Sequence, residues 1–193
     1  MKTKITTLVL LAALIMTTSI LTGCASPKGS SGMEKRSYVQ SMRNDALTEL
    51  YSLKPDTRSE IAAAPGYAVF EAVKTQFIIT TTGNAYGVVH DNQTGADTYM
   101  SALGAGAGFG AGIKNFRAVV VFTNRTVMND FVNKGWVFGA SGTADAKSST
   151  GGGSVSDSMA FGDGMKVYTF TDQGLMAGAS LNGTKVWKDE KLN

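Results

Sequence analysis

The chain has 193 residues, of which 43% are hydrophobic and 17% are charged, and its formal net charge is +3. This length favours a single domain, and the apolar content is high enough to bury a core, which excludes a disordered chain. The single cysteine and single histidine exclude a disulfide framework and any metal site built on two imidazoles, so we expect no cofactor. The charge is too small for a nucleic-acid-binding surface.

The first 24 residues have the pattern of a bacterial secretion signal. An apolar run over Ile5 to Leu21 follows two early lysines and ends in the sequence LTGC at residues 21–24. This ending resembles a lipoprotein signal, which predicts removal of residues 1–23 and acylation of Cys24. The alternative is a signal anchor with an incidental cysteine. Ala25 stands where aspartate is associated with inner-membrane retention, so the resemblance favours the periplasmic face of the outer membrane.

Residues 24–32 are predicted to form the acylated cysteine and a flexible tether. The sequence from Ala25 to Gly32 is small, polar and without a hydrophobic pattern, which is typical of a linker. A single folded domain is then expected over residues 33–193. Eight linker residues reach about 27 Å at most, so acylation at Cys24 would hold this domain close to the lipid surface.

A first helix is predicted over residues 33–53, where apolar residues recur at helical spacing. Its apolar stripe has a basic border, and two interpretations are open. The stripe docks on the core of the domain, or it faces a membrane with the basic side chains at head-group level. The second interpretation gives five candidate lipid contacts: Val39 and Met42 in the stripe, and Arg36, Arg43 and Lys54 on its border.

The rest of the chain is predicted to consist mainly of strands. A short helix over residues 56–64 precedes Pro65, the last proline, and the glycine-rich remainder suits a sheet with tight bends. One further helix is expected from Thr123 or Asn124 to Lys134–Gly135. The strand candidates are residues 67–73, 76–82, 85–90, 98–113 in one or two pieces, 116–123, 136–144, 166–171, 175–181 and 184–187.

Three local signals refine this pattern. Asn182–Gly183 predicts a hairpin between the last two strands. The continuous apolar run from Ala118 to Phe122 predicts a strand that is covered on both faces. The polar sequence from Lys147 to Ser156 predicts a loop.

Glycine occupies alternate positions in one part of the sequence, so an extended chain there would have one face without side chains. Another surface should lie close against that face. A packed helix or a neighbouring sheet is one candidate for this surface, and an acyl chain or a flat apolar ligand is the other. The glycines are Gly104, Gly106, Gly108, Gly110 and Gly112.

Motifs for catalysis are not found in the sequence. A Ser-His-Asp hydrolase could use only His90, and no Gly-x-Ser-x-Gly motif is present, although that motif carries the nucleophile of many hydrolases. His90 next to Asp91 is interpreted as a turn residue at the end of a strand. No pair of carboxylates is marked for acid–base chemistry. We therefore expect a protein that is not an enzyme.

Several runs of residues together suggest a family. The most specific is the run from Gly174 to Gly183, with the pattern Gly-Leu-x-Ala-Gly-x-Ser-Leu-x-Gly. The others are Gly66 to Phe70, the alternating glycines, Val119 to Phe122, and Phe131 with Gly135-Trp136. Over about residues 35–188, the sequence resembles the SYLF domain family in its bacterial lipoprotein branch.

The resemblance implies an α+β fold, with N-terminal helices packed on a strongly bent, Gly-rich antiparallel sheet that is barrel- or sandwich-like, and a general lipid affinity. Eukaryotic relatives bind phosphoinositides through a basic amphipathic helix, and some bind actin. The expected function is therefore that of a non-enzymatic envelope lipoprotein whose domain contacts anionic phospholipid or an apolar ligand. The alternative is a structural or interaction module that is anchored only by its acyl chains and has an envelope protein as partner.

Overall fold

The computed structural model describes residues 26–77, 80–105, 116–138, 146–148, 159–161, 164–171, 174–175, 181 and 183–193. The helices in these ranges are α2 (Gly32–Leu53), α3 (Thr57–Ala63) and α4 (Arg125–Lys134). The strands are β1 (Gly66–Phe77), β2 (Thr80–Asp91), β3 (Asp97–Ala105), β4 (Phe116–Phe122), β5 (Trp136–Val137), β6 (Ala146–Ser148), β7 (Met159–Phe161), β8 (Met165–Thr171), β9 (Gly174–Leu175) and β10 (Thr184–Lys188).

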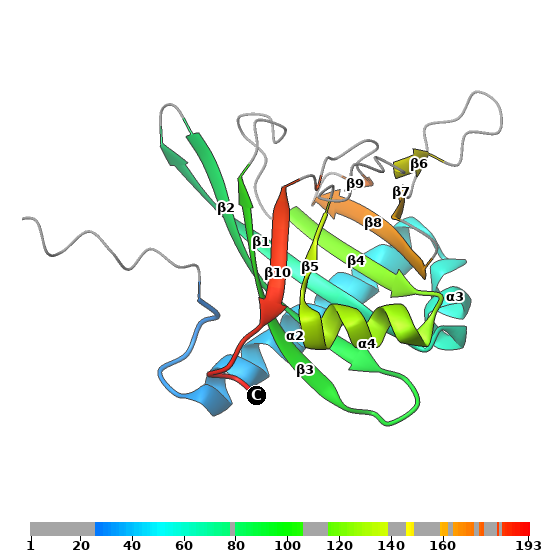
Figure 1. The fold of residues 1–193 in the computed structure, drawn as a ribbon, viewed down its shortest axis with the longest axis horizontal. Helices are drawn as coiled ribbons and strands as arrows, with labels where there is room; N and C mark the ends of the chain where they lie inside the picture. Colours follow the sequence, from blue (N-terminus) through cyan, green and yellow to red (C-terminus); the bar gives the residue numbers. More distant parts are fainter. Residues whose placement is uncertain are drawn as a thin grey trace, which may run out of the picture.

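All ten strands belong to one antiparallel sheet that curls strongly (Figure 1). The order across it is β5-β10-β3-β2-β1-β4-β8-β7-β6, and β9 pairs with β8. The central strands β1 and β2 are paired in register from Gly66 opposite Asp91 to Phe77 opposite Thr80. The predicted α+β class with helices on a bent antiparallel sheet is confirmed.

Helices cover both faces of the sheet. On one face, α2 and α3 pack on β1, β2 and β4, whereas α4 packs on the opposite, concave face against β1, β4 and β10. Strand β4 therefore contributes alternately to two cores, with Val120 facing α4 and Val119 facing α2. Residues Ala118 to Phe122 are all 5% exposed or less, which confirms the prediction of a strand covered on both faces.

Local sequence signals account for the ends of the helices. Ser31 and Glu34 form a reciprocal capping box at the start of α2, which satisfies backbone donors that lack a helical partner. The Asn124 side chain accepts from the N–H of Thr126 at 2.8 Å and starts α4. Gly135, with φ of 73°, ends α4, because few residues with a side chain adopt that backbone conformation.

Some predicted strand boundaries are wrong. The predicted strand over residues 76–82 contains the end of β1 and the start of β2, so it is not a separate element. The N–H of Thr184 bonds the carbonyl of Leu181, which makes a turn from Leu181 to Thr184, but β10 does not pair with β9, the described strand before it. Instead, β9 pairs with β8, and β10 pairs with β3 and β5.

Two segments predicted to be irregular or flexible have contacts in the structure. Lys147 and Ser148, at the start of the predicted loop, lie in β6 and pair with β7. Within the predicted tether, Pro27 is buried, and the ammonium of Lys28 lies 5.7 Å from the ring centroid of Tyr38. Residues 27 and 28 of the predicted tether therefore contact the folded domain.

Replacing Asp91 by asparagine is expected to remove a contribution to stability that depends on pH. Arg125 donates to both carboxylate oxygens of Asp91, at 2.9 and 2.5 Å, which links α4 to the end of β2. These hydrogen bonds hold the pKa of Asp91 well below its usual value. Because folding lowers this pKa, the ionised carboxylate of Asp91 stabilises the fold at pH values above its unfolded-state pKa of about 4. This contribution to the free energy of unfolding is lost as the pH falls towards the folded-state pKa.

Urea unfolding at neutral and acidic pH tests this expectation. Wild type should be more stable than Asp91→Asn at neutral pH, and the difference should shrink on acidification. Asp130→Asn is the matched control, because Asp130 forms a more exposed ion pair with Lys134 and exposed pairs contribute little. A difference for Asp91→Asn that stays constant with pH would contradict the assignment.

Candidate functional site

The basic side chains predicted on α2 are used to attach the helix to the rest of the domain. Arg43 donates to both carboxylate oxygens of Asp97, at 2.8 and 3.0 Å, and lies 3.5 Å from Nδ1 of His90. Arg36 donates to the backbone carbonyl of Leu192 at 3.2 Å. These contacts join α2 to the β2–β3 region and to the C-terminal segment, so the predicted lipid role would require both arginines to leave their partners.

The predicted apolar lipid contacts lie inside the protein. Val39 is fully buried and Met42 is 4% exposed, because both side chains face the sheet within the core beneath α2. Of the two interpretations that the sequence left open, the structure has the one in which the apolar stripe of α2 docks on the core. Neither side chain can reach a bilayer in this fold. Lys54 is the C-terminal cap of α2, where its N–H donates to the carbonyl of Leu50.

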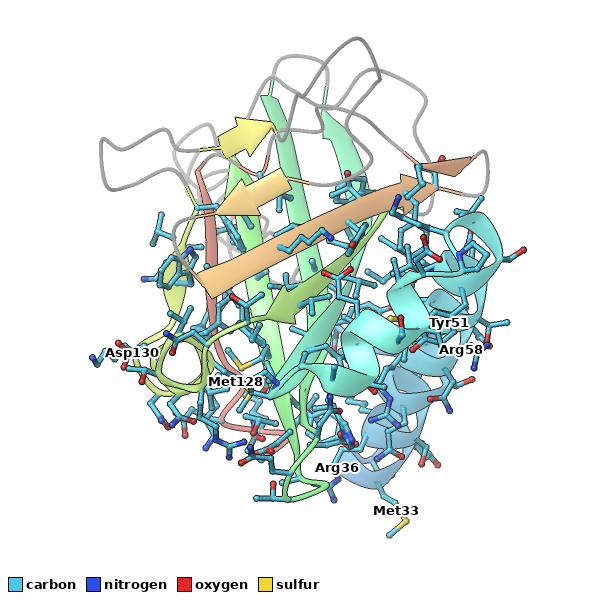
Figure 2. The ribbon with its side chains drawn as sticks, turned by 90° about the vertical axis from the view of Figure 1, so that its right-hand side faces the viewer. Met33, Arg36, Tyr51, Arg58, Met128 and Asp130 are labelled. Atoms are coloured by element: carbon cyan, nitrogen blue, oxygen red, sulfur yellow. The ribbon has the colours of Figure 1, made fainter. Side chains whose placement is uncertain are left out.

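The two ends of α2 differ in their surroundings, as Figure 2 shows. Met33, at the first turn, is 73% exposed and projects from the end of the helix (Figure 2). At the other end, the Arg58 guanidinium from α3 lies 4.4 Å from the ring centroid of Tyr51. The second end is therefore packed against α3, whereas Met33 at the first end is exposed to solvent.

The alternating glycines and the predicted acylation site lie mostly outside the described residues. Gly104 is described and lies in β3, opposite Gly83 of β2 and Thr184 of β10. Gly106, Gly108, Gly110, Gly112 and Cys24 are not among the described residues, so their roles remain predictions.

A polar row crosses the sheet directly beneath α2. Glu71 of β1 is in register with Tyr86 of β2 on one side and Arg117 of β4 on the other. The Tyr86 hydroxyl donates to Glu71 at 2.6 Å, and Nε of Arg117 donates to Glu71 at 3.3 Å. Arg117 also donates to Glu49 of α2. The row therefore connects three strands to the helix.

The surroundings of Tyr86 and Arg117 shift the pKa values of these two groups. Burial is the main cause that raises the pKa of Tyr86, and the hydrogen bond to Glu71 raises it further. The phenol therefore stays neutral and acts as a donor. Burial alone would lower the pKa of Arg117, but the hydrogen bond to Glu49 and the charges of Glu49 and Glu71 outweigh it and raise that pKa. Neither group titrates near neutral pH, so the row is suited to holding α2 in place.

A small cleft opens beside this row. Its volume is about 90 Å³, and its lining residues are Tyr38, Ser41, Met42, Asp45, Glu71 and Arg117. Sites for drug-sized ligands usually have about 300–1,000 Å³ and a mainly apolar lining. The cleft is therefore too small and too polar to hold an acyl chain. Within the described parts of the chain, no group of three acidic, histidine or cysteine side chains could hold a metal ion.

An exposed surface further along the same face of the sheet, on β3, β10 and β5, was missed by the sequence analysis. Lys185 of β10 lies between Val137 of β5 and Leu103 of β3, in one row across three strands. Trp187 lies two residues further along β10. Leu103 is 42%, Val137 40% and Trp187 38% exposed. We call these four residues the outer wing. One sequence signal could have identified this surface: Val186 and Trp187 are consecutive apolar residues in a predicted strand. Successive side chains of a strand point to opposite faces, so one of the two must point outward.

The second half of the chain matches a known protein family. Residues 103–193 match the model of the Ysc84 family, described as Las17-binding protein actin regulator. The chain carries a Ysc84/SYLF family domain. The SYLF domain match begins within β3 and therefore leaves out β1 and β2. In the sheet, these two strands lie between β3 and β4, which both have matched residues. The part of the chain before residue 103 therefore completes the sheet of the SYLF domain.

A curated relative supports the same relationship. Beta cell expansion factor A of Aeromonas veronii is 31% identical to this chain over 159 residues, which are 82% of this chain. The match covers 59% of that relative, so this SYLF-domain chain spans less than two thirds of its length. None of the helices in the described ranges has the length and apolar character needed to cross a bilayer.

Proposed function

We propose that the chain is an envelope lipoprotein, acylated at Cys24, whose SYLF domain contacts anionic phospholipid at the membrane surface and catalyses no reaction. The general lipid affinity implied by the SYLF resemblance supports this proposal. We propose the surface contact ahead of the apolar ligand that the sequence also allowed, because the cleft beside Glu71, which lies among the described residues, is small and polar. The localisation rests on the lipoprotein signal at residues 21–24.

The observation that carries the proposal is the docking of the segment before α2. Pro27 is buried, and Lys28 lies over the ring of Tyr38. Only Ala25 and Ser26 therefore separate Cys24 from Pro27, and the three Cα–Cα steps between them span about 11 Å at most. Acyl chains on Cys24 would insert into the bilayer, so this short connection would keep the domain within reach of the lipid head groups.

Replacing Cys24 by serine should release the protein from the membrane. Wild type should stay in the membrane fraction through a high-salt wash and should incorporate labelled palmitate, because several acyl chains give stable anchoring. The Cys24→Ser variant should incorporate no label and should be removed by the wash. Ser26→Ala is the control, since it alters the same segment and keeps the thiol.

A labelled Cys24→Ser protein, or a variant that resists the wash as wild type does, would show that Cys24 is not the anchor. A protein partner is the second candidate function, because the family description names proteins that bind Las17 and regulate actin. Binding of the unacylated chain to anionic vesicles separates the two candidates, since a protein-interaction module anchored only by its acyl chains should not bind them.

A further inference from the structure

The outer wing combines exposed apolar side chains with a cation. Leu103, Val137 and Trp187 are each about two-fifths exposed. Lys185, also exposed, lies directly opposite Leu103 on one neighbouring strand and Val137 on the other. Large apolar side chains gathered on one exposed face commonly mark an interaction surface.

The outer wing points away from both cores of the domain. The residues that alternate with it face inward, since Ala102 and Val186 are buried in the core of the concave face. The outer wing is therefore on the convex face. Helix α2 shares that face but packs on β1, β2 and β4, which leaves β10 and β5 at the other end of the curled sheet. Among the described residues, α2 therefore does not cover the outer wing.

The segment that leads to Cys24 docks close to the outer wing. Lys28 lies over Tyr38, and the Tyr38 and Tyr86 hydroxyls are 3.4 Å apart. Tyr86 is in register with Ser101, which is in register with Trp187. Two strand spacings of about 4.8 Å separate the backbones of Tyr86 and Trp187, so about 10 Å of sheet lies between the residue that contacts Tyr38 and the outer wing.

The chemistry of the outer wing fits an anionic bilayer. Tryptophan has an apolar ring with a polar N–H and is enriched at membrane interfaces. A lysine near an anionic leaflet contributes about 1 kcal/mol of attraction. The C-terminal strand and tail bear three lysines and two acids: Lys185, Lys188, Lys191, Asp189 and Glu190. This small positive excess favours an anionic surface but predicts weak binding without the acyl anchor.

We propose that the SYLF domain meets the anionic membrane through the outer wing, with Leu103, Val137 and Trp187 at the acyl boundary and Lys185 among the phosphates, and that α2 does not make this contact. The proposal rests on the proposed lipid-contacting function and adds the surface that carries it. It also explains how the arginines of α2 can keep their partners within the domain.

Trp187 can report on this contact directly. The chain has two tryptophans, so Trp136→Phe leaves Trp187 as the single emitter. The protein to use starts at position 24 and carries Cys24→Ser, so that no acyl chain contributes; every described contact lies within residues 26–193. Vesicles of equal parts phosphatidylcholine and phosphatidylglycerol should shift the Trp187 emission to the blue, and brominated acyl chains should quench it. Vesicles of phosphatidylcholine alone should bind much less.

A pair of variants tests whether the outer wing drives binding. Leu103→Ser with Val137→Ser should lower vesicle binding about tenfold, because two apolar side chains lose their burial in the acyl boundary. Met33→Ser with Leu53→Ser is the matched control on α2, where these side chains are 73% and 38% exposed. It should change binding by less than about twofold if α2 does not touch the membrane. Thermal melting should show that both variants remain folded.

The outcomes separate the two proposals. No binding of wild type to anionic vesicles overturns the proposed function, and the outer-wing contact falls with it. Binding with unquenched Trp187, or binding reduced by the α2 pair and not by the outer-wing pair, overturns the outer-wing contact and leaves the lipid function standing. A Trp187 emission shift that depends on protein concentration without vesicles would make the outer wing an interface between proteins, which also overturns the proposal.

Discussion

Phe131→Ala is expected to lower the free energy of unfolding by about 3–5 kcal/mol, the usual cost of removing a large buried aromatic side chain. Phe131 of α4 is fully buried, and its ring meets four others at centroid distances of 5.2–6.5 Å, namely Phe70, Phe122, Trp136 and Phe138. Aromatic pairs of this kind add about 0.5–1.5 kcal/mol beyond area burial. The ring is therefore the main contact between α4 and the concave face.

Thermal melting and urea unfolding measure this effect. For a domain of this size, a loss of 3–5 kcal/mol corresponds to a fall in Tm of roughly 6–20 °C. Asn129→Ala is the control, because Asn129 lies on the same helix and is exposed, and such changes usually stay within about 0.5 kcal/mol. A loss below about 1 kcal/mol for Phe131→Ala would mean that the concave core collapses around the missing ring.

Arg117→Met is expected to lower the free energy of unfolding by about 2–3 kcal/mol. Breaking a fully buried ion pair costs about 3–5 kcal/mol, and the side chain of Arg117 is 19% exposed, so part of the cost is screened by water. The methionine keeps most of the apolar volume but leaves Glu49 and Glu71 facing one another beneath α2 without their shared cation. Like charges in such a site repel strongly, because the surroundings screen them poorly.

Urea unfolding with linear extrapolation gives the free-energy differences. Adding Glu49→Gln and Glu71→Gln to Arg117→Met should recover part of the loss, because these changes remove the unpaired carboxylates. Lys134→Met is the matched control: it removes a cation whose ion pair with Asp130 is 73% and 43% exposed, and it should cost less than about 1 kcal/mol. A loss as small as that of the control would show that the row does not hold α2 in place.

The elements that local sequence predicts well are those whose limits are set by nearby residues. The Ser31–Glu34 box starts α2, and Asn124 and Gly135 bound α4, because each signal acts within one turn of the helix. Gly66 is a different case, since a Cβ there would collide with the backbone carbonyl oxygen of His90 and would lie 2.5 Å from Sδ of Met128 on α4. A sequence shows the glycine but not the helix that approaches it from 62 residues further along the chain.

The strand errors have the same physical origin. A strand is stabilised by a partner that can be distant in sequence, so a local turn signal does not identify what each strand pairs with. The chain turns between Leu181 and Thr184, yet β10 pairs with β3, where its partner residues lie 80 to 88 positions earlier. The run from β1 into β2 contains many residues that suit strands, so the pattern alone could not show where the chain reverses.

The sequence by itself determined the order and type of the helices, the doubly covered strand β4 and the family of the domain, because these depend on local caps, on the apolar pattern and on motifs within one segment. Only the tertiary structure decided what the charged side chains do. Arg43 meets Asp97 54 residues away, and Arg36 meets the carbonyl of Leu192 156 residues away. An arginine on a helix border has the same local sequence whether it faces a lipid or a carboxylate, and the curled sheet brings these partners to α2 while leaving Trp187 and its neighbours exposed on the convex face.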